Sequence, residues 1–232
     1  MSDTSQDGRD EAAGSAAASD PFESQKTLAD VLRQRLSERS RLVLPAAAMG
    51  LRESAVLVPI LWHADAPPEV LYIVRRADAP THSGQVAFPG GKREAHDGSI
   101  TDTALRESFE EVGLPPDHVT LCGLLDDVPT PAGFNITPVV GIIAMDRPAP
   151  VRFEPNQREV AELFRVPVPA FAPSYHLAGH TRWQGIRYAL HEFHYPDPGL
   201  PAPRRIWGAT ARMTHQLLSL LDLLPPMRDD LD

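Results

Sequence analysis

The chain is short of the residues that mark a secreted, membrane-spanning or zinc-binding protein. Its 232 residues include one cysteine, Cys122, so no intrachain disulfide can form, and no Cys/His cluster suggests a zinc site. No apolar run approaches the length needed to span a bilayer, and no apolar segment follows a basic start as in a secretory signal. These absences favour a reducing compartment, and we expect a cytoplasmic protein with no membrane partner.

The net charge of −9 is concentrated at the two ends of the chain. Residues 1–25 hold six acidic residues and one arginine, and residues 225–232 hold three acidic residues and one arginine. The ends therefore account for −7, and residues 26–224 carry about −2. A nearly neutral body gives no reason to expect a nucleic-acid partner. We predict a disordered acidic tail over 1–25, a single folded domain over 26–224 and a short C-terminal tail over 225–232.

Aromatic residues are few (6%) and proline is frequent (24 residues), which favours a loop-rich mixed fold over a helical bundle. Hydrophobic spacing and turn residues predict helices over residues 27–41, 100–112, 158–164 and 207–224. Strands are predicted over residues 55–62, 70–74, 119–125 and 136–144, with one or two more over 183–193. Residues 75–97 are expected to form a long polar loop, which in a compact domain is commonly functional. No βαβ period repeats, so we predict an α/β domain of the α+β type, with a mixed sheet flanked by helices.

Three carboxylates gather on the helix predicted over residues 100–112. At about 100° per residue, Glu107, Glu110 and Glu111 fall within an arc of roughly 100° on one face. The opposite face is expected to be buried and is formed by Leu105, Phe109 and Val112. Like charges at these spacings repel, so a cation is the expected compensation, and oxygen-only ligands favour Mg²⁺ or Mn²⁺. A solvated acidic face is the commoner outcome for such a triplet, so its surroundings decide between the two.

The surroundings of the triplet favour a metal site. The glycine pair Gly90-Gly91 upstream lets backbone approach a ligand closely, and Arg106 can orient a carboxylate or meet a phosphate. With that glycine pair, residues 106–114 (RESFEEVGL) resemble the Nudix box, G-x5-E-x7-R-E-U-x-E-E-x-G-U, in which U is a bulky apolar residue. The resemblance implies a Nudix α/β/α sandwich with a mixed sheet, and hydrolysis of a nucleoside diphosphate linked to another group.

The match to the box is imperfect ahead of the helix. Counting back from Arg106, the upstream glutamate of the box falls on Gly98 and its glycine on Lys92. The loop is therefore longer than the pattern, and a substitute for the glutamate is expected at Glu94 or Asp97. In addition, a serine, Ser108, occupies a position that is usually apolar.

The residues ahead of the box narrow the resemblance to one branch. Residues 82–91 (HSGQVAFPGG) are similar to the coenzyme A pyrophosphatase signature H-x-G-Q-[VI]-[AS]-F-P-G-G, and the longer loop is similar to that branch too. Residues 130–141 and 206–211 also resemble segments of those enzymes, so the resemblance covers about residues 50–224. It implies cleavage of coenzyme A or its derivatives to 3′,5′-ADP and 4′-phosphopantetheine or acyl-phosphopantetheine. Two alternatives stay open: a Nudix pyrophosphatase of ADP-ribose, NADH or modified nucleoside triphosphates, and a non-catalytic Nudix-fold binding or regulatory module.

The resemblance assigns roles within the carboxylate helix. Glu107, Glu110 and Glu111, with the carbonyl of Gly90, are expected to bind Mg²⁺ or Mn²⁺. Glu107, positioned by Arg106, is the first candidate for the general base, and metal ligation by Glu107 is equally open. A further ligand is sought among three distant carboxylates, Glu154, Glu159 and Glu162.

Four residues ahead of the helix are expected to shape the site for a small nucleotide-like substrate. They are His82, Gln85, Gly91 and Lys92. Two aromatic residues, Phe134 and Trp207, are expected to pack in the fold rather than to bind substrate. The sequence leaves open whether the enzyme forms a homodimer.

Overall fold

The structure is a computed structural model that describes residues 20–76, 84–183, 186–226 and 230–231. Two long strands, β1 (Arg52–Trp62) and β7 (Phe134–Ala144), run parallel at the centre of the main sheet, paired from Arg52↔Phe134 to Trp62↔Ala144. Both strands are rich in Val, Ile and Leu, and β1 is buried along its last nine residues, as expected for a central strand covered on both faces.

Antiparallel strands complete this sheet on both sides of the central pair. Within the described residues it holds eight strands in the path β3-β2-β1-β7-β5, with β4 on β1, β6 on β7 and β8 on β2. The added strands are β2 (Glu69–Arg75), β3 (Val86–Ala87), β4 (Gly90–Lys92), β5 (Val119–Leu124), β6 (Val128–Thr130) and β8 (Val160–Pro167). One parallel pair among antiparallel ones makes the sheet mixed, as predicted.

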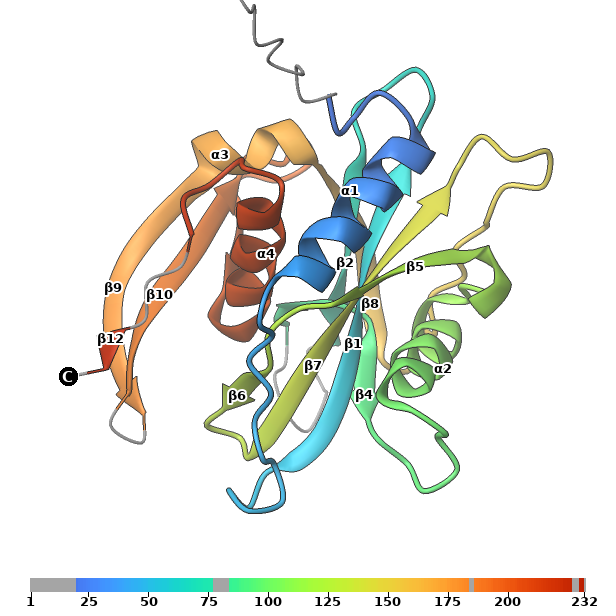
Figure 1. Cartoon of the computed structure of the whole chain (residues 1–232). Coiled ribbons are helices and arrows are strands. Elements are labelled where there is room, and N and C mark those ends of the chain that lie inside the picture. The colour runs from blue at the N-terminus through green and yellow to red at the C-terminus, as the bar shows by residue number, and fades with distance from the viewer. Residues whose placement is uncertain (1–19, 77–83, 184–185, 227–229, 232) are drawn as a thin grey trace, which may run out of the picture.

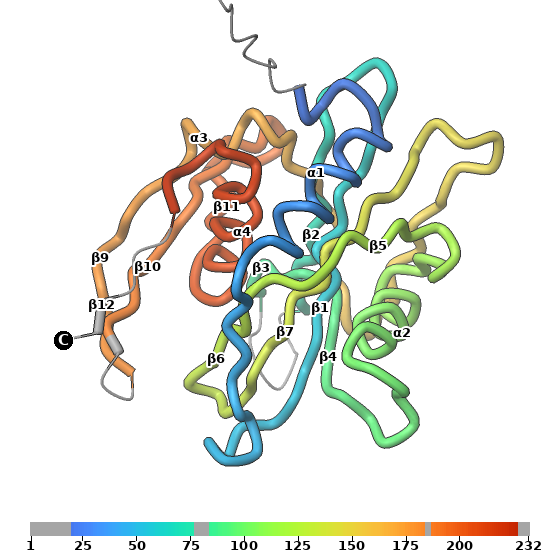
Figure 2. Tube along the Cα trace, in the orientation of Figure 1, coloured from blue at the N-terminus to red at the C-terminus, as the bar shows by residue number. Residues whose placement is uncertain are grey.

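Helices cover both faces of the sheet (Figures 1 and 2). On one face, α1 (Gln25–Glu38) and α4 (Gly208–Leu220) contribute to a core that includes Leu32 and the alternate residues of β1 that point that way. On the other face, α2 (Ile100–Val112) contributes Val112 to a second core. The resulting α/β/α sandwich confirms the predicted fold class. In it, α2 packs against β1 and β4.

A second, smaller sheet packs against the far side of α4. It consists of β9 (Tyr175–Trp183), β10 (Ile186–Tyr195), β11 (Arg204–Trp207) and β12 (Asp230–Leu231). Phe193 of β10 is fully buried in the same core as α1 and α4, so α4 lies between the two sheets (Figure 1). Short helical turns link the strands at η1 (Pro116–His118), η2 (Val168–Ala170) and α3 (Phe171–Ser174).

The helix expected over residues 100–112 has those bounds, because both of its ends carry strong local signals. The Ser99 side chain accepts the N–H of Asp102 at 3.1 Å, and Gly113 takes the left-handed conformation (φ 70°) that ends the helix. The N-terminal helix was also predicted, although α1 starts two residues earlier and ends three residues earlier than the expected range of 27–41.

The helix predicted over residues 158–164 is wrong, because this segment belongs to strand β8. Val160, Leu163 and Phe164 fit a helical spacing, but the segment pairs antiparallel with β2, where Val166 lies opposite Val70. Tertiary pairing therefore overrides an ambiguous local pattern. The expected polar loop over 75–97 contains the short strands β3 and β4, and the terminal helix spans residues 208–220 rather than 207–224.

Most of the predicted acidic tail, residues 1–25, lies outside the described residues. At the other end, β12 pairs with β10. Among the helices of the described ranges, none combines the length and apolar character needed to cross a membrane.

Candidate active site

The carboxylate helix α2 docks on the sheet through small side chains. Ala104 and Ser108 are fully buried, and the Ser108 hydroxyl donates to the carbonyl of Ala104 at 2.7 Å, so its burial leaves no unmet donor. Phe109, expected on the buried face, is 55% exposed, and that expectation is wrong. The small residues let α2 approach β1 closely, and they rotate the helix so that Glu111 turns inward.

Glu111 is a buried carboxylate, with 2% of its surface exposed. One of its oxygens accepts the backbone N–H of Gly90 at 2.8 Å, and the other lies 3.7 Å from Nη1 of Arg75. Burial raises the pKa of Glu111 to about 7; the Gly90 and Arg75 contacts oppose this rise, while the charges of Glu107 and Glu159 add to it. A buried carboxylate beside like charges is stabilised in its ionised form by a bound cation.

Glu107 lies against the glycine pair. A Cβ atom on Gly91 would fall under 3.0 Å from the Glu107 carboxyl carbon and from both of its oxygens, so a glycine is the residue that leaves room for this carboxylate. Burial raises the pKa of Glu107, hydrogen bonding and charge from Arg106 oppose the rise, and the neighbouring carboxylates Glu110 and Glu159 add to it. The sequence therefore places a partly desolvated carboxylate directly on exposed backbone.

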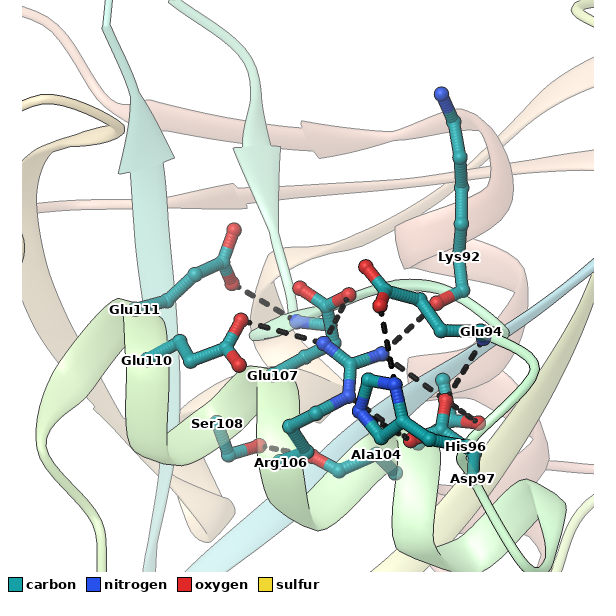
Figure 3. A network of polar contacts seen from close by, with 12 residues as sticks. Lys92, Glu94, His96, Asp97, Ala104, Arg106, Glu107, Ser108, Glu110 and Glu111 are labelled. Atoms are coloured by element: carbon teal, nitrogen blue, oxygen red, sulfur yellow. Dashed lines mark hydrogen bonds and ion pairs between the residues drawn. The ribbon is translucent and has the colours of Figure 1, made fainter.

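Arg106 connects the helix to the loop ahead of it (Figure 3). Its guanidinium forms a two-point pair with Asp97, from Nε at 2.9 Å and from Nη2 at 3.0 Å, and Nη2 also donates to the Lys92 carbonyl at 3.0 Å. The remaining nitrogen, Nη1, donates to Glu107 at 3.0 Å and to Glu110 at 3.2 Å. Arg106 thus fixes two of the three glutamates, and the same pairing holds the pKa of Asp97 well below its usual range.

Of the two substitutes expected for the upstream glutamate of the box, Asp97 is the one that pairs with Arg106. Its side chain is 2% exposed, and besides Arg106 it accepts the N–H of Glu94 and the hydroxyl of Thr103, each at 2.9 Å. Five residues separate it from Gly91, as in the box, and the extra residue lies between Asp97 and Arg106. Counting forward from the glycine, rather than back from the arginine, was the signal in the sequence that selects Asp97 over Glu94.

One of the three distant acidic residues acts on the helix through its charge. Glu159, just before β8, raises the pKa of both inward-facing glutamates of α2 through its charge. In contrast, Glu162 is paired with Arg204, and the backbone N–H of Glu154 caps the end of α2 by donating to the Val112 carbonyl at 2.9 Å. The pairing of β8 with β2 therefore brings Glu159, rather than its neighbours, to the site.

Comparison with known proteins assigns this arrangement to a family. The family model of the NUDIX domain matches residues 51–184, more than half of the chain. The chain belongs to the Nudix hydrolase family. A Pectobacterium atrosepticum protein named "Uncharacterized Nudix hydrolase NudL" is 42% identical over 183 residues, which is 77% of this chain and 89% of that protein. A Yersinia pestis protein of the same name is 37% identical over 168 residues, covering 72% and 78% of the two chains.

Solved structures of Nudix proteins also align with part of the chain. The M. Smegmatis Nudix hydrolase RenU covers 53% of this chain and 74% of its own, at 27% identity and a TM-score of 0.43. The C. elegans Ap4A hydrolase binary complex covers 50% and 80%, at 17% identity and a TM-score of 0.41. As a Nudix hydrolase, the chain is an enzyme of the pyrophosphohydrolase type, and members of this family act on small nucleotide-type molecules, generally with divalent metal ions.

The donor set of the Nudix helix fits a hard divalent cation. The candidate side-chain ligands on α2 are carboxylates alone, and burial raises the pKa of two of them, Glu107 and Glu111. In the described ranges no three acidic, histidine or cysteine side chains converge as a ready-made cage, and Arg106 is paired with Glu107 and Glu110. The positive charge of Arg106 offsets part of the negative charge of Glu107 and Glu110.

The predicted substrate-binding residues have different surroundings in the Nudix fold. His82 lies outside the described residues, and the carbonyl of Gln85 accepts the N–H of Arg75 at 3.0 Å where β2 meets β3. Lys92 extends away from the glutamates, as Figure 3 shows. Trp207, expected to pack in the fold, is 42% exposed at the start of α4, so that expectation is wrong.

Proposed function

We propose that this Nudix hydrolase cleaves the pyrophosphate linkage of coenzyme A or its derivatives. The products are 3′,5′-ADP and 4′-phosphopantetheine, or acyl-phosphopantetheine when the substrate is acylated. The observation that carries the hydrolytic part is the contact of the Glu107 carboxylate with Gly91, where a desolvated acid meets backbone that a phosphate can approach. The substrate part rests on the signature in residues 82–91 and on the arrangement of the segments that share the resemblance.

Three segments that suggested the coenzyme A branch lie near one another in the fold. The Thr210 hydroxyl, from the segment 206–211, donates to the carbonyl of Val86 at 3.0 Å. Phe134, from the segment 130–141, has its ring centre 5.9 Å from the Lys92 amine, directly after the glycine pair. Segments distant in the sequence therefore surround β3 and β4, which supports a shared role in binding one substrate.

The residues of α2 have different roles in the proposed reaction. We assign Glu107, Glu110 and Glu111, with the Gly90 carbonyl, as the ligands of Mg²⁺ or Mn²⁺. When bound, such an ion neutralises phosphate oxygens and lowers the pKa of water. Glu107 is our candidate for the base that takes a proton from the attacking water, whose oxygen bonds to phosphorus as the bond to the bridging oxygen breaks. Arg106 positions Glu107 and Glu110 for these roles through its hydrogen bonds.

The test is a substrate panel on the purified full chain with Mg²⁺ or Mn²⁺, with products identified by mass. We expect coenzyme A to give both products. Its kcat/KM should be higher than the kcat/KM for hydrolysis of ADP-ribose, NADH or modified nucleoside triphosphates. Glu107→Gln should lose most of this activity, whereas Glu162→Gln, whose carboxylate is paired with Arg204, should keep it. Efficient hydrolysis of another dinucleotide without release of either product from coenzyme A would overturn the proposal. A cytoplasmic location remains a prediction from the sequence, and a homodimer stays an open alternative.

A further inference from the structure

An open cavity of about 440 Å³ has Lys92, the residue after the glycine pair, in its wall. Its walls are the start of β1, the end of β4 and the loop that leads to Asp97. A volume of this size is within the range of small-molecule sites. The walls are charged rather than apolar, which is the composition of a site for an ionic group.

The charges that line the cavity are unequally neutralised. Two of its carboxylates have cationic partners, since Glu53 pairs with Arg93 at 3.0 Å and Asp97 pairs with Arg106, whereas Glu94 lies 3.3 Å from His96, which is charged only when protonated. Two cations, Arg52 and Lys92, are left over, because within the described ranges neither forms an ion pair with a carboxylate. The cavity therefore has an excess of positive charge at these two side chains, and an anion would complement it.

One aromatic ring holds the two cations together. The Arg52 guanidinium lies 4.0 Å from the centre of the Phe134 ring, and the Lys92 amine lies 5.9 Å from the same centre. Nη2 of Arg52 donates to the Ala132 carbonyl at 3.3 Å, while among the described residues its Nε and Nη1 form no hydrogen bond. A guanidinium stacked in this way keeps donors in its plane for a phosphate.

Sheet register explains why these residues meet. Arg52 of β1 pairs with Phe134 of β7, and two residues further along β1, Ser54 pairs with Lys92 of β4. Because side chains alternate along a strand, Lys92 points to the opposite face of β4 from the Gly91 position that meets Glu107. Within the described strands β4 pairs only with β1, and on its other edge the Gly90 N–H and the Lys92 carbonyl bond to Glu111 and Arg106.

We propose that Arg52 and Lys92, on the Phe134 ring, bind a phosphate monoester attached to the ribose of the substrate's nucleotide half. This inference rests on the proposed function, in which the reacting pyrophosphate lies at Gly91 and Glu107. In coenzyme A the group is the 3′-phosphate, and in a phosphorylated nicotinamide dinucleotide it is the 2′-phosphate. The site selects substrates by their additional phosphate, while the glutamates act on the linkage that all of them share.

The experiment compares coenzyme A with 3′-dephospho-coenzyme A, and NADPH with NADH, by steady-state kinetics on the full chain. We expect the wild type to prefer coenzyme A over its dephosphorylated form by on the order of tenfold in kcat/KM, mainly through KM. Arg52→Gln and Lys92→Gln should each reduce this preference toward one. Arg52→Lys should retain part of it because it keeps the charge.

Arg165→Gln is the matched control, since the Arg165 guanidinium also lies against an aromatic ring, 5.6 Å from the centre of Phe153, but does not line the cavity. It should keep the wild-type preference to within about twofold. Thermal melting shows whether Arg52→Gln and Lys92→Gln are folded. The subsite is contradicted if both folded variants keep the wild-type preference, or if they lower kcat/KM equally for the two substrates. Failure of the proposed function looks different: coenzyme A is then not cleaved, and the NADPH-to-NADH ratio tests the subsite in its place.

Discussion

Replacing Gly91 with alanine isolates the contact between the glycine pair and Glu107. The added Cβ would lie under 3.0 Å from the carboxyl carbon and both oxygens of Glu107. Ordinary contact between carbon atoms is about 3.5–4.0 Å, so the carboxylate must move by roughly 1 Å. The backbone at Gly91 does not lie in the left-handed region, so alanine itself adds no backbone strain.

A displacement of this size in a reacting group reduces rate far more than stability. Misplacement by about 1 Å commonly lowers catalysis by about 100-fold, or about 2.7 kcal/mol in the activation free energy. The hydrogen bond from Arg106 to Glu107 weakens at the same time, which lowers the free energy of unfolding by about 1 kcal/mol. We therefore expect a large loss of kcat with a melting temperature only a few degrees lower.

The assay is steady-state hydrolysis of coenzyme A, combined with thermal melting of the same preparations. Gly199→Ala serves as the control, because a Cβ at Gly199 meets its nearest atom, an oxygen of Asp197, at an ordinary 3.5 Å. Wild-type kcat in Gly91→Ala would refute the reasoning, as would a loss of activity fully explained by unfolding.

Three further predictions follow from the same site. In metal-free protein, the raised pKa of Glu111 means that the folded state binds its proton more tightly than the unfolded state, so stability falls as pH rises from about 4.5 to about 7. Urea unfolding at pH 5 and pH 8 should show that Glu111→Gln removes about 2–3 kcal/mol of this fall, and equal slopes in the two proteins would contradict it. Asp97→Asn should lower stability by about 2 kcal/mol in urea unfolding and reduce kcat, because Arg106 loses its two-point partner; an unchanged kcat would show that this pairing does not position Glu107. Chelation by EDTA should abolish activity and Mg²⁺ or Mn²⁺ should restore it, with Glu159→Gln raising the metal concentration needed; an equal rise in the surface control Glu162→Gln would contradict that role.

Local signals in the sequence were sufficient for the carboxylate helix. Ser99 and Gly113 fix its ends, and the spacing of the glutamates fixes which of them share a face. The depth of burial was not predictable from spacing alone, because the docking of α2 through Ala104 and Ser108 turns Glu111 inward and leaves Phe109 exposed. Hydrophobic periodicity identifies an apolar face only when the apolar residues are the ones that pack.

Long-range pairing determined the parts that the sequence could not predict. Val160, Leu163 and Phe164 fit a helix as well as a strand, and only the antiparallel partner β2 decides for the strand that brings Glu159 to the site. In the same way, Arg52 and Phe134 meet through the parallel pairing of β1 and β7, and nothing near either residue in the chain indicates the contact.

The products formed from coenzyme A test most directly whether this enzyme cleaves its pyrophosphate linkage. Mass spectrometry of a reaction with Mg²⁺ in ¹⁸O-labelled water should show equimolar 3′,5′-ADP and 4′-phosphopantetheine, with one labelled oxygen in one of the two products. Glu107→Gln should form them at least about 100-fold more slowly. If the wild type forms neither product, or if the wild type and Glu107→Gln have equal rates, coenzyme A hydrolysis at Glu107 is contradicted.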